Sequence, residues 1–148
     1  MATQVQTLNY IGGEFRAARS GAVDEVLDPA TGEVIAEVAS SDAADAADAV
    51  EAASAAFESW RKTTPRERFE MITKLADAIE ADLPELKRLE SLNVGKPVSI
   101  IDFEFDLTVD NFRFFAAAAR FMEGRAGGEY LEDHTSFVRR DPIGVIVG

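Results

Sequence analysis

The sequence predicts an α/β fold, and the residues alone also leave an α+β fold open. Short runs of β-branched residues bounded by glycine and proline turns fill the N-terminal part of the 148-residue chain. Apolar residues then recur at three- and four-residue steps, which indicates helices. The chain finishes on Val-Ile-Val-Gly, a pattern typical of a buried parallel strand that leads into a βα turn.

Two turns organise the N-terminal strands. Gly12 and Gly13 separate residues 8–11 from residues 14–15, and such a pair supplies the positive φ angles of a tight hairpin. Residues 28–32, Asp-Pro-Ala-Thr-Gly, predict a second turn, because proline fixes φ and glycine tolerates left-handed backbone. A further strand is expected over residues 33–38.

Helix start signals mark the first two helices. Residues 40–42 can cap the first helix, and Thr64, Pro65 and Glu67 form a capping box for the second. The apolar stripe of the first helix includes Ala43, Val50, Ala53, Phe57 and Trp60. Its opposite face, with Asp45, Asp48, Glu51 and Glu58, is expected to be solvated. The second helix should bury Phe69, Ile72, Ala76, Ile79 and Leu83.

Two more helices follow. One begins near Pro84 and ends at Gly95. The longest is expected over residues 99–122 and carries two apolar stripes, so it should lie in the interior or at a subunit boundary. One stripe is Ile100, Phe103, Leu107, Phe114, Ala118 and Phe121, and the other is Phe105, Val109, Phe112 and Ala116.

Strand patterns close the chain. Residues 135–140 precede an Asp-Pro turn over residues 141–144, and Val145 to Val147 should form a buried strand. A chain end of this kind, with no following helix, favours a truncated protein over a self-contained module, whose tail would be polar.

Composition excludes several classes of function. The formal net charge of −12 gives no electrostatic reason to bind nucleic acid or an anionic membrane. With no cysteine and a single histidine, the chain holds no thiol nucleophile, disulfide, zinc–cysteine site or multi-histidine metal site. No apolar run is long enough to span a bilayer and no secretory signal is visible, so a cytoplasmic protein is expected.

Few polar residues suggest chemistry. Asp110-Asn111 interrupts an apolar stripe and is either a buried acid or amide in a site or, more economically, a buried polar group that is hydrogen-bonded to the backbone. His134 is either a general base or a histidine in a loop or at a strand edge, and the second interpretation is favoured. Arg139-Arg140 is expected to form salt bridges rather than a phosphate clamp. No phosphate-binding glycine loop is found.

The order of six short motifs is more informative than the chemistry of any one. Together they resemble the opening of an NAD(P)-dependent aldehyde dehydrogenase. The segments that carry the resemblance are residues 10–15, 28–35, 56–60, 89–97, 111–116 and 139–148. Residues 93–97, Asn-Val-Gly-Lys-Pro, and the phenylalanine-rich helix are most similar to the branch that oxidises aminobutyraldehyde, betaine aldehyde or phenylacetaldehyde.

The resemblance implies that the chain is the N-terminal third of such an enzyme. Residues 1–123 would belong to the cofactor-binding domain, residues 124–140 to the oligomerisation hairpin and residues 141–148 to the first core strand of the dinucleotide-binding sheet. The hairpin and the phenylalanine-rich helix would then join subunits into a homo-oligomer.

The family mechanism uses a cysteine thiolate and a general-base glutamate that lie beyond this chain. The resemblance therefore implies no catalytic and no cofactor-binding residue here, and an inactive isolated chain. The full enzyme would oxidise an aldehyde to its acid with NAD or NADP. Two alternatives stay open, namely a non-catalytic assembly module and one half of a split enzyme.

One family site could persist in part. Several members hold a monovalent cation, K⁺ or Na⁺, at positions that correspond to Val26, Leu27 and Asn93 in this sequence. Asn93 stands where the family usually has aspartate, so a carbonyl oxygen is kept and a charge is lost. The alternative is a pair of ordinary turns.

Overall fold

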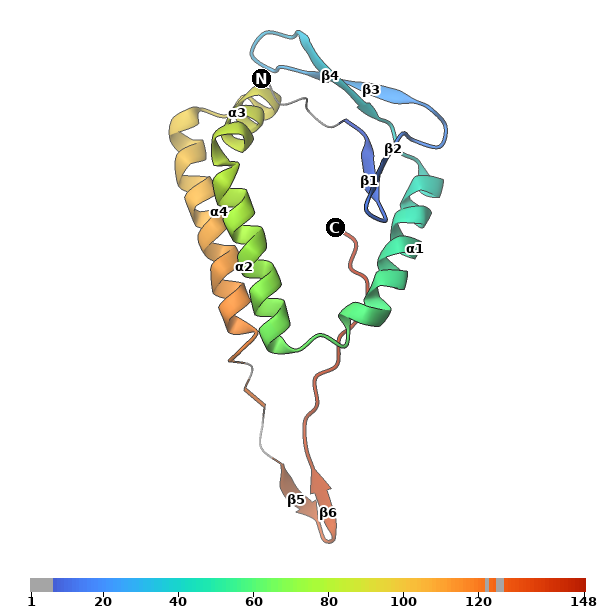
Figure 1. Cartoon of the computed structure of the whole chain (residues 1–148), viewed down its shortest axis with the longest axis vertical. Helices are drawn as coiled ribbons and strands as arrows, with labels where there is room; N and C mark the ends of the chain where they lie inside the picture. The colour runs from blue at the N-terminus through green and yellow to red at the C-terminus, as the bar shows by residue number, and fades with distance from the viewer. Residues whose placement is uncertain (1–6, 122, 125–126) are drawn as a thin grey trace.

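The structure is a computed structural model that describes residues 7–121, 123–124 and 127–148. These residues form four helices and three separate two-stranded antiparallel sheets, in agreement with the α/β prediction (Figure 1). In chain order the elements are β1 (Asn9–Ile11), β2 (Glu14–Arg16), β3 (Val23–Leu27), β4 (Val34–Ala39), α1 (Ala43–Trp60), α2 (Pro65–Ala81), α3 (Leu83–Val94), α4 (Val98–Ala118), β5 (Gly128–Leu131) and β6 (His134–Ser136).

Both predicted N-terminal turns form. Gly12 and Gly13 have φ angles of 63° and 88° between β1 and β2. In the second turn the Asp28 carboxylate accepts a 2.8 Å hydrogen bond from the Ala30 N–H, and the turn leads into β4. The partner of β4 is β3, which the sequence pattern did not locate, because its five residues include two adjacent carboxylates and show no clear alternation.

The helix caps largely follow the sequence. Thr64 and Glu67 form the expected reciprocal pair at the start of α2. At α1 the Asp42 carboxylate accepts hydrogen bonds from the Ala44 and Asp45 N–H groups, and Asp45 in turn accepts one from the Asp42 N–H. Gly95, with a φ of 68°, ends α3. Helix α4 ends at Ala118 rather than at the predicted Met122, which lies outside the described residues.

The predicted solvated face of α1 is correct at Glu51 and Glu58, which are exposed, and wrong at Asp45. Asp45 is only 4% exposed, because the loop after β2 packs over it and the Arg19 N–H donates a 2.9 Å hydrogen bond to its carboxylate. Hydrogen bonds from the Asp42 and Arg19 backbone hold the pKa of Asp45 below its ordinary value. Asp48 pairs with the Arg19 guanidinium. The stripe that includes Val50 and Ala53 is more exposed than Asp45.

The best-packed part of the molecule lies between α2 and α4. Ala76, Ile101, Val109 and Ala116 are buried there. The second predicted stripe of α4 therefore faces inward. The first stripe does not, since Phe103 is 70% exposed and Phe114 is 64% exposed. Of the two positions expected for α4, the interior is correct for the second stripe only, and the subunit boundary stays a prediction.

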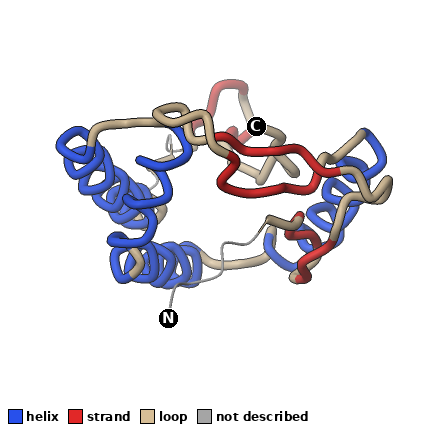
Figure 2. Tube along the Cα trace, turned by 90° about the horizontal axis from the view of Figure 1, so that it is seen from above, coloured by secondary structure: helices blue, strands red, loops and turns tan. Residues whose placement is uncertain are grey.

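Helices α2, α3 and α4 lie together on one side of the molecule, and α1 lies on the other beside β1 and β2 (Figure 1). From above, the helices fall into the same two groups with strands between them (Figure 2). The accessible surface is 11568 Å². A compact monomer of 16.1 kDa exposes about 7,400 Å². The segment therefore exposes roughly 4,000 Å² more than its mass requires.

The strand predicted over residues 145–147 is absent from the structure. Residues 141–148 follow an extended path with no paired neighbour, and a strand needs a hydrogen-bonded partner to form a ladder. Val145 and Ile146 instead line a small pocket with Phe57 and Trp60 of α1. The strand pattern at residues 135–140 is realised only as β6, which pairs with β5 in a hairpin that projects beyond the helices (Figure 1).

Candidate functional site

The candidate site is the junction where the turn after β3 meets the connection between α3 and α4. Gly95 occupies the centre of this junction. A Cβ added at Gly95 would lie 2.9 Å from the Pro29 Cγ, so the two segments approach more closely than any side chain at position 95 allows. The sequence singled out Gly95 only as a helix stop. Because Gly95 and Pro29 are far apart in the chain, no local sequence pattern predicts their contact.

Lys96 fixes the same connection from the other side. Its Nζ donates hydrogen bonds to Glu104 at 2.6 Å and to Glu90 at 2.9 Å, and these bonds raise the pKa of Lys96 above its ordinary value. The Ser91 hydroxyl donates a 2.9 Å hydrogen bond to the Lys96 carbonyl. The start of α4 is thereby tied to the end of α3.

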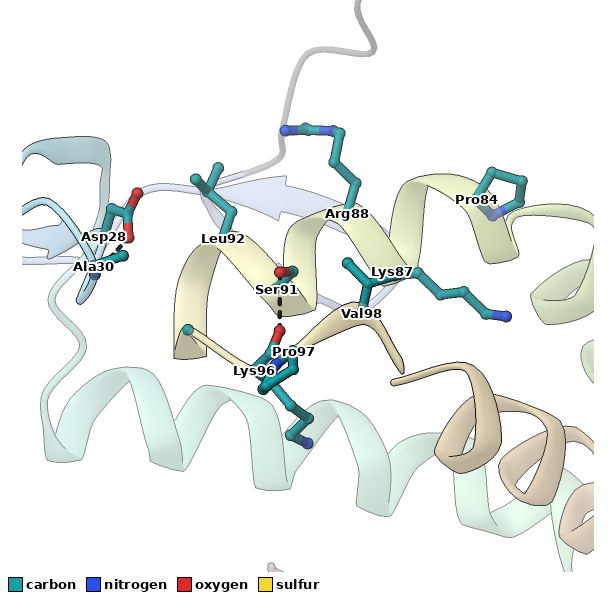
Figure 3. A pocket seen from close by; sticks show the side chains of 11 residues that line it. Asp28, Ala30, Pro84, Lys87, Arg88, Ser91, Leu92, Lys96, Pro97 and Val98 are labelled. Carbon is teal, nitrogen blue, oxygen red and sulfur yellow. Dashed lines mark hydrogen bonds between the residues drawn. The ribbon is translucent and has the colours of Figure 1, made fainter. Parts of the chain in front are cut away.

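An open pocket of about 800 Å³ lies over this junction (Figure 3). Three basic side chains border it. Lys96 is bound by two carboxylates, Lys87 pairs with Asp102 at 2.8 Å and Arg88 pairs with Glu85 at 2.8 Å. Because each cation already has a carboxylate partner, the pocket offers little attraction to an anionic ligand.

A neighbouring pocket of about 330 Å³ brings two of the three predicted cation-site residues together. Val26 and Asn93 both line it, whereas Leu27 does not. The pairing of β3 with β4 shifts register between Val26 and Leu27, so the ladder is interrupted at this point. Most of the remaining wall is apolar and consists of Ile35, Ala36, Val38, Leu86, Leu89, Leu92 and Phe105.

Asn93 lines this pocket, and its side-chain amide oxygen is a ligand of the kind that hard cations take. The nearest carboxylate in the wall, Glu90, is engaged by Lys96. Within the described part of the chain, no three His, Cys, Asp or Glu residues gather as metal ligands. The described lining thus offers a cation a neutral amide oxygen and a carboxylate that Lys96 already engages.

Both interpretations of Asp110-Asn111 required burial, and both are wrong. The two residues are exposed on α4, because the stripe that they interrupt is the one that faces solvent. Arg113, the only basic residue of α4, turns instead toward α2. Its guanidinium donates to Glu80 at 2.6 Å and to Asp77 at 3.0 Å.

The interpretation of His134 as a strand-edge residue is confirmed. It begins β6, is exposed, and its Nδ1 lies 2.8 Å from the Glu132 carbonyl oxygen. Arg139 forms the expected salt bridge, with Asp141 at 2.9 Å. Among the described residues no carboxylate pairs with Arg140, so the expectation holds for one arginine of the two.

Neither pocket at the junction contains a nucleophile with an activating base. The chain has no cysteine, and the only nearby serine, Ser91, is committed to the Lys96 carbonyl. The described lining of these two pockets thus shows no arrangement for nucleophilic catalysis. Across the described residues, every helix is too short or too polar to cross a bilayer.

Comparisons with known proteins agree over nearly the whole chain. A family model described as "Aldehyde dehydrogenase family" matches residues 15–148. An aldehyde dehydrogenase of Vibrio cholerae serotype O1 is 38% identical over 140 residues, which cover 93% of this chain and 27% of that protein.

Solved structures give the same correspondence. PnpE in complex with nicotinamide adenine dinucleotide matches with a TM-score of 0.88 and 36% identity, over 94% of this chain and 28% of that one. Betaine aldehyde dehydrogenase from Staphylococcus aureus matches with a TM-score of 0.85 and 28% identity, over 90% of this chain and 28% of that one. The chain thus spans between a quarter and a third of the proteins it resembles.

Proposed function

Because this chain belongs to the aldehyde dehydrogenase family, we propose that it is the N-terminal segment of an enzyme that oxidises an aldehyde to a carboxylic acid with NAD or NADP. The observation that carries the proposal is the family match over residues 15–148, combined with coverage of only 27% of the Vibrio cholerae relative. The activity would belong to the longer polypeptide, and residues 1–148 would supply its scaffold.

The segment alone is expected to be inactive. The family reaction needs a thiolate to attack the aldehyde, and this chain has no thiol. Hydride transfer needs a bound nicotinamide, which the cofactor supplies when the full enzyme holds it. Neither pocket at the junction offers free cations for the phosphates of that cofactor. We therefore place cofactor binding and chemistry in the remainder of the enzyme.

The excess surface supports a role as part of a larger assembly. Roughly 4,000 Å² of additional exposed area on one chain is more than the roughly 1,000–2,500 Å² that each partner buries in an obligate interface. We propose that residues 1–123 belong to the cofactor-binding domain and that residues 141–148 become its first core strand once neighbouring strands are present. Val145 and Ile146 line a pocket with Phe57 and Trp60 of α1, which supports a place for this strand beside α1.

Residues 124–140 form the proposed oligomerisation hairpin. The β5–β6 pair projects away from the helices, and Tyr130 and Phe137 are 89% and 74% exposed (Figure 1). Aromatic side chains at such exposure are typical of surfaces that become buried on association. The exposed stripe of α4, with Phe103 and Phe114, is the second surface that we assign to contacts between subunits.

A monovalent cation, K⁺ or Na⁺, is proposed at Val26, Leu27 and Asn93, with the remaining ligands supplied by the longer polypeptide. The interrupted ladder at Val26 and the position of Asn93 in the same pocket support it. Thermal unfolding of the full-length enzyme should then shift to higher temperature in KCl or NaCl than in choline chloride. Asn93→Ala should abolish the difference, whereas Asn111→Ala should keep it.

The substrate class is proposed to be an aminoaldehyde, betaine aldehyde or phenylacetaldehyde. Residues 93–97 and the phenylalanine-rich helix support this branch, as does the likeness to a betaine aldehyde dehydrogenase. We place the enzyme in the cytoplasm as part of the same proposal. A panel of an aminoaldehyde, betaine aldehyde, phenylacetaldehyde and a simple aliphatic aldehyde, assayed by NADH or NADPH formation, tests the substrate class.

The first test is the intact mass of the native gene product. A mass several-fold above 16.1 kDa, together with aldehyde-dependent NADH or NADPH formation, is expected. A purified 16.1 kDa product with no activity would overturn the proposal. Residues 1–148 expressed alone serve as the matched control and should form no reduced cofactor at any aldehyde concentration.

The projecting hairpin and the exposed aromatic residues also favour a second candidate, a non-catalytic assembly module. Residues 1–148 would then bind intact subunits of a homologue, and a mixture should yield a co-migrating species on size-exclusion chromatography. A split enzyme makes a different prediction, since a pull-down would recover a cysteine-bearing partner that restores activity. If the mixture gives no co-migrating species and the pull-down recovers no such partner, the N-terminal segment of a single longer enzyme is the remaining candidate.

A further inference from the structure

We draw no further inference here: the strongest candidate, the exposed apolar face of α4 that carries Phe103, Leu107 and Phe114, carries nothing because nothing in the structure shows what covers it.

Discussion

Replacement of Gly95 by alanine should destabilise the protein more than the same replacement at Gly32, another turn glycine with positive φ. Two costs add at this position. A left-handed backbone, here with a φ of 68°, costs an alanine about 1–2 kcal/mol. The new methyl would also lie 2.9 Å from the Pro29 Cγ, and relief of such an overlap costs about 1–3 kcal/mol because the proline ring is held in its turn. The expected loss of unfolding free energy is therefore about 2–5 kcal/mol.

Urea unfolding followed by circular dichroism measures this loss, with Gly32→Ala as the control. Gly32 has a φ of 77°, and a methyl added there would have no neighbouring atom within 4 Å, so its replacement incurs the backbone cost alone. The double variant with Pro29→Ala should recover the steric part of the Gly95→Ala loss. Equal losses for the two glycine variants, with no recovery from Pro29→Ala, would show that the close approach between the turn and α3 does not exist.

Three further variants test the helices. Thr64→Ala removes the side-chain cap of α2 and should cost about 1 kcal/mol in urea unfolding. Ile101→Ala, at a fully buried position, should cost about 2–5 kcal/mol, while Ile143→Ala, at 90% exposure, should cost under about 0.5 kcal/mol. Arg113 lowers the pKa of Glu80 in the folded state, so the pair stabilises above the unfolded carboxyl pKa and loses this effect as pH falls through the folded pKa. Arg113→Gln should therefore lower the melting temperature near about pH 7 and lower it less near about pH 3, and an equal decrease at both would contradict the ion pair.

Local signals in the sequence predicted the helices well. Thr64, Pro65 and Glu67 define the start of α2 because a capping box is satisfied within four residues, and Gly95 ends α3 because it can adopt a positive φ. The hairpin at Gly12 follows for the same reason. In each case the energy that decides the conformation comes from residues adjacent in the chain.

Predictions that depended on distant residues were less successful. Asp45 was assigned to solvent from helix periodicity, yet the loop that carries Arg19 covers it. Asp110 was expected to be buried because its stripe is apolar, but α2 and α3 pack on the other side of α4. Periodicity reports which residues share a helix face, while the contacts of that face are decided by elements elsewhere in the sequence.

The candidate site shows the same division. Asn93 and Val26 were selected through a resemblance, and the structure places both at one pocket. The sequence did not predict the contact between Gly95 and Pro29 or the hydrogen bonds from Lys96 to its two glutamates. Both features lie within the motifs that carried the resemblance. The residues of those motifs thus pack the turn after β3 against the end of α3, and none of them has a catalytic role in this structure.

This packing role connects the fold to the proposed function. In the proposed enzyme, a segment without a thiol cannot supply the nucleophile, and its packing would position the parts that do. The segment has more apolar surface than its own elements bury. One side of α4 is exposed, and residues 145–147 have no strand partner. A sequence that encodes more apolar surface than it buries by itself gains stability when that surface is covered. The isolated segment should therefore bind a hydrophobic dye more strongly than the full enzyme does. Equal dye binding by both would contradict the proposal that the longer polypeptide covers this surface.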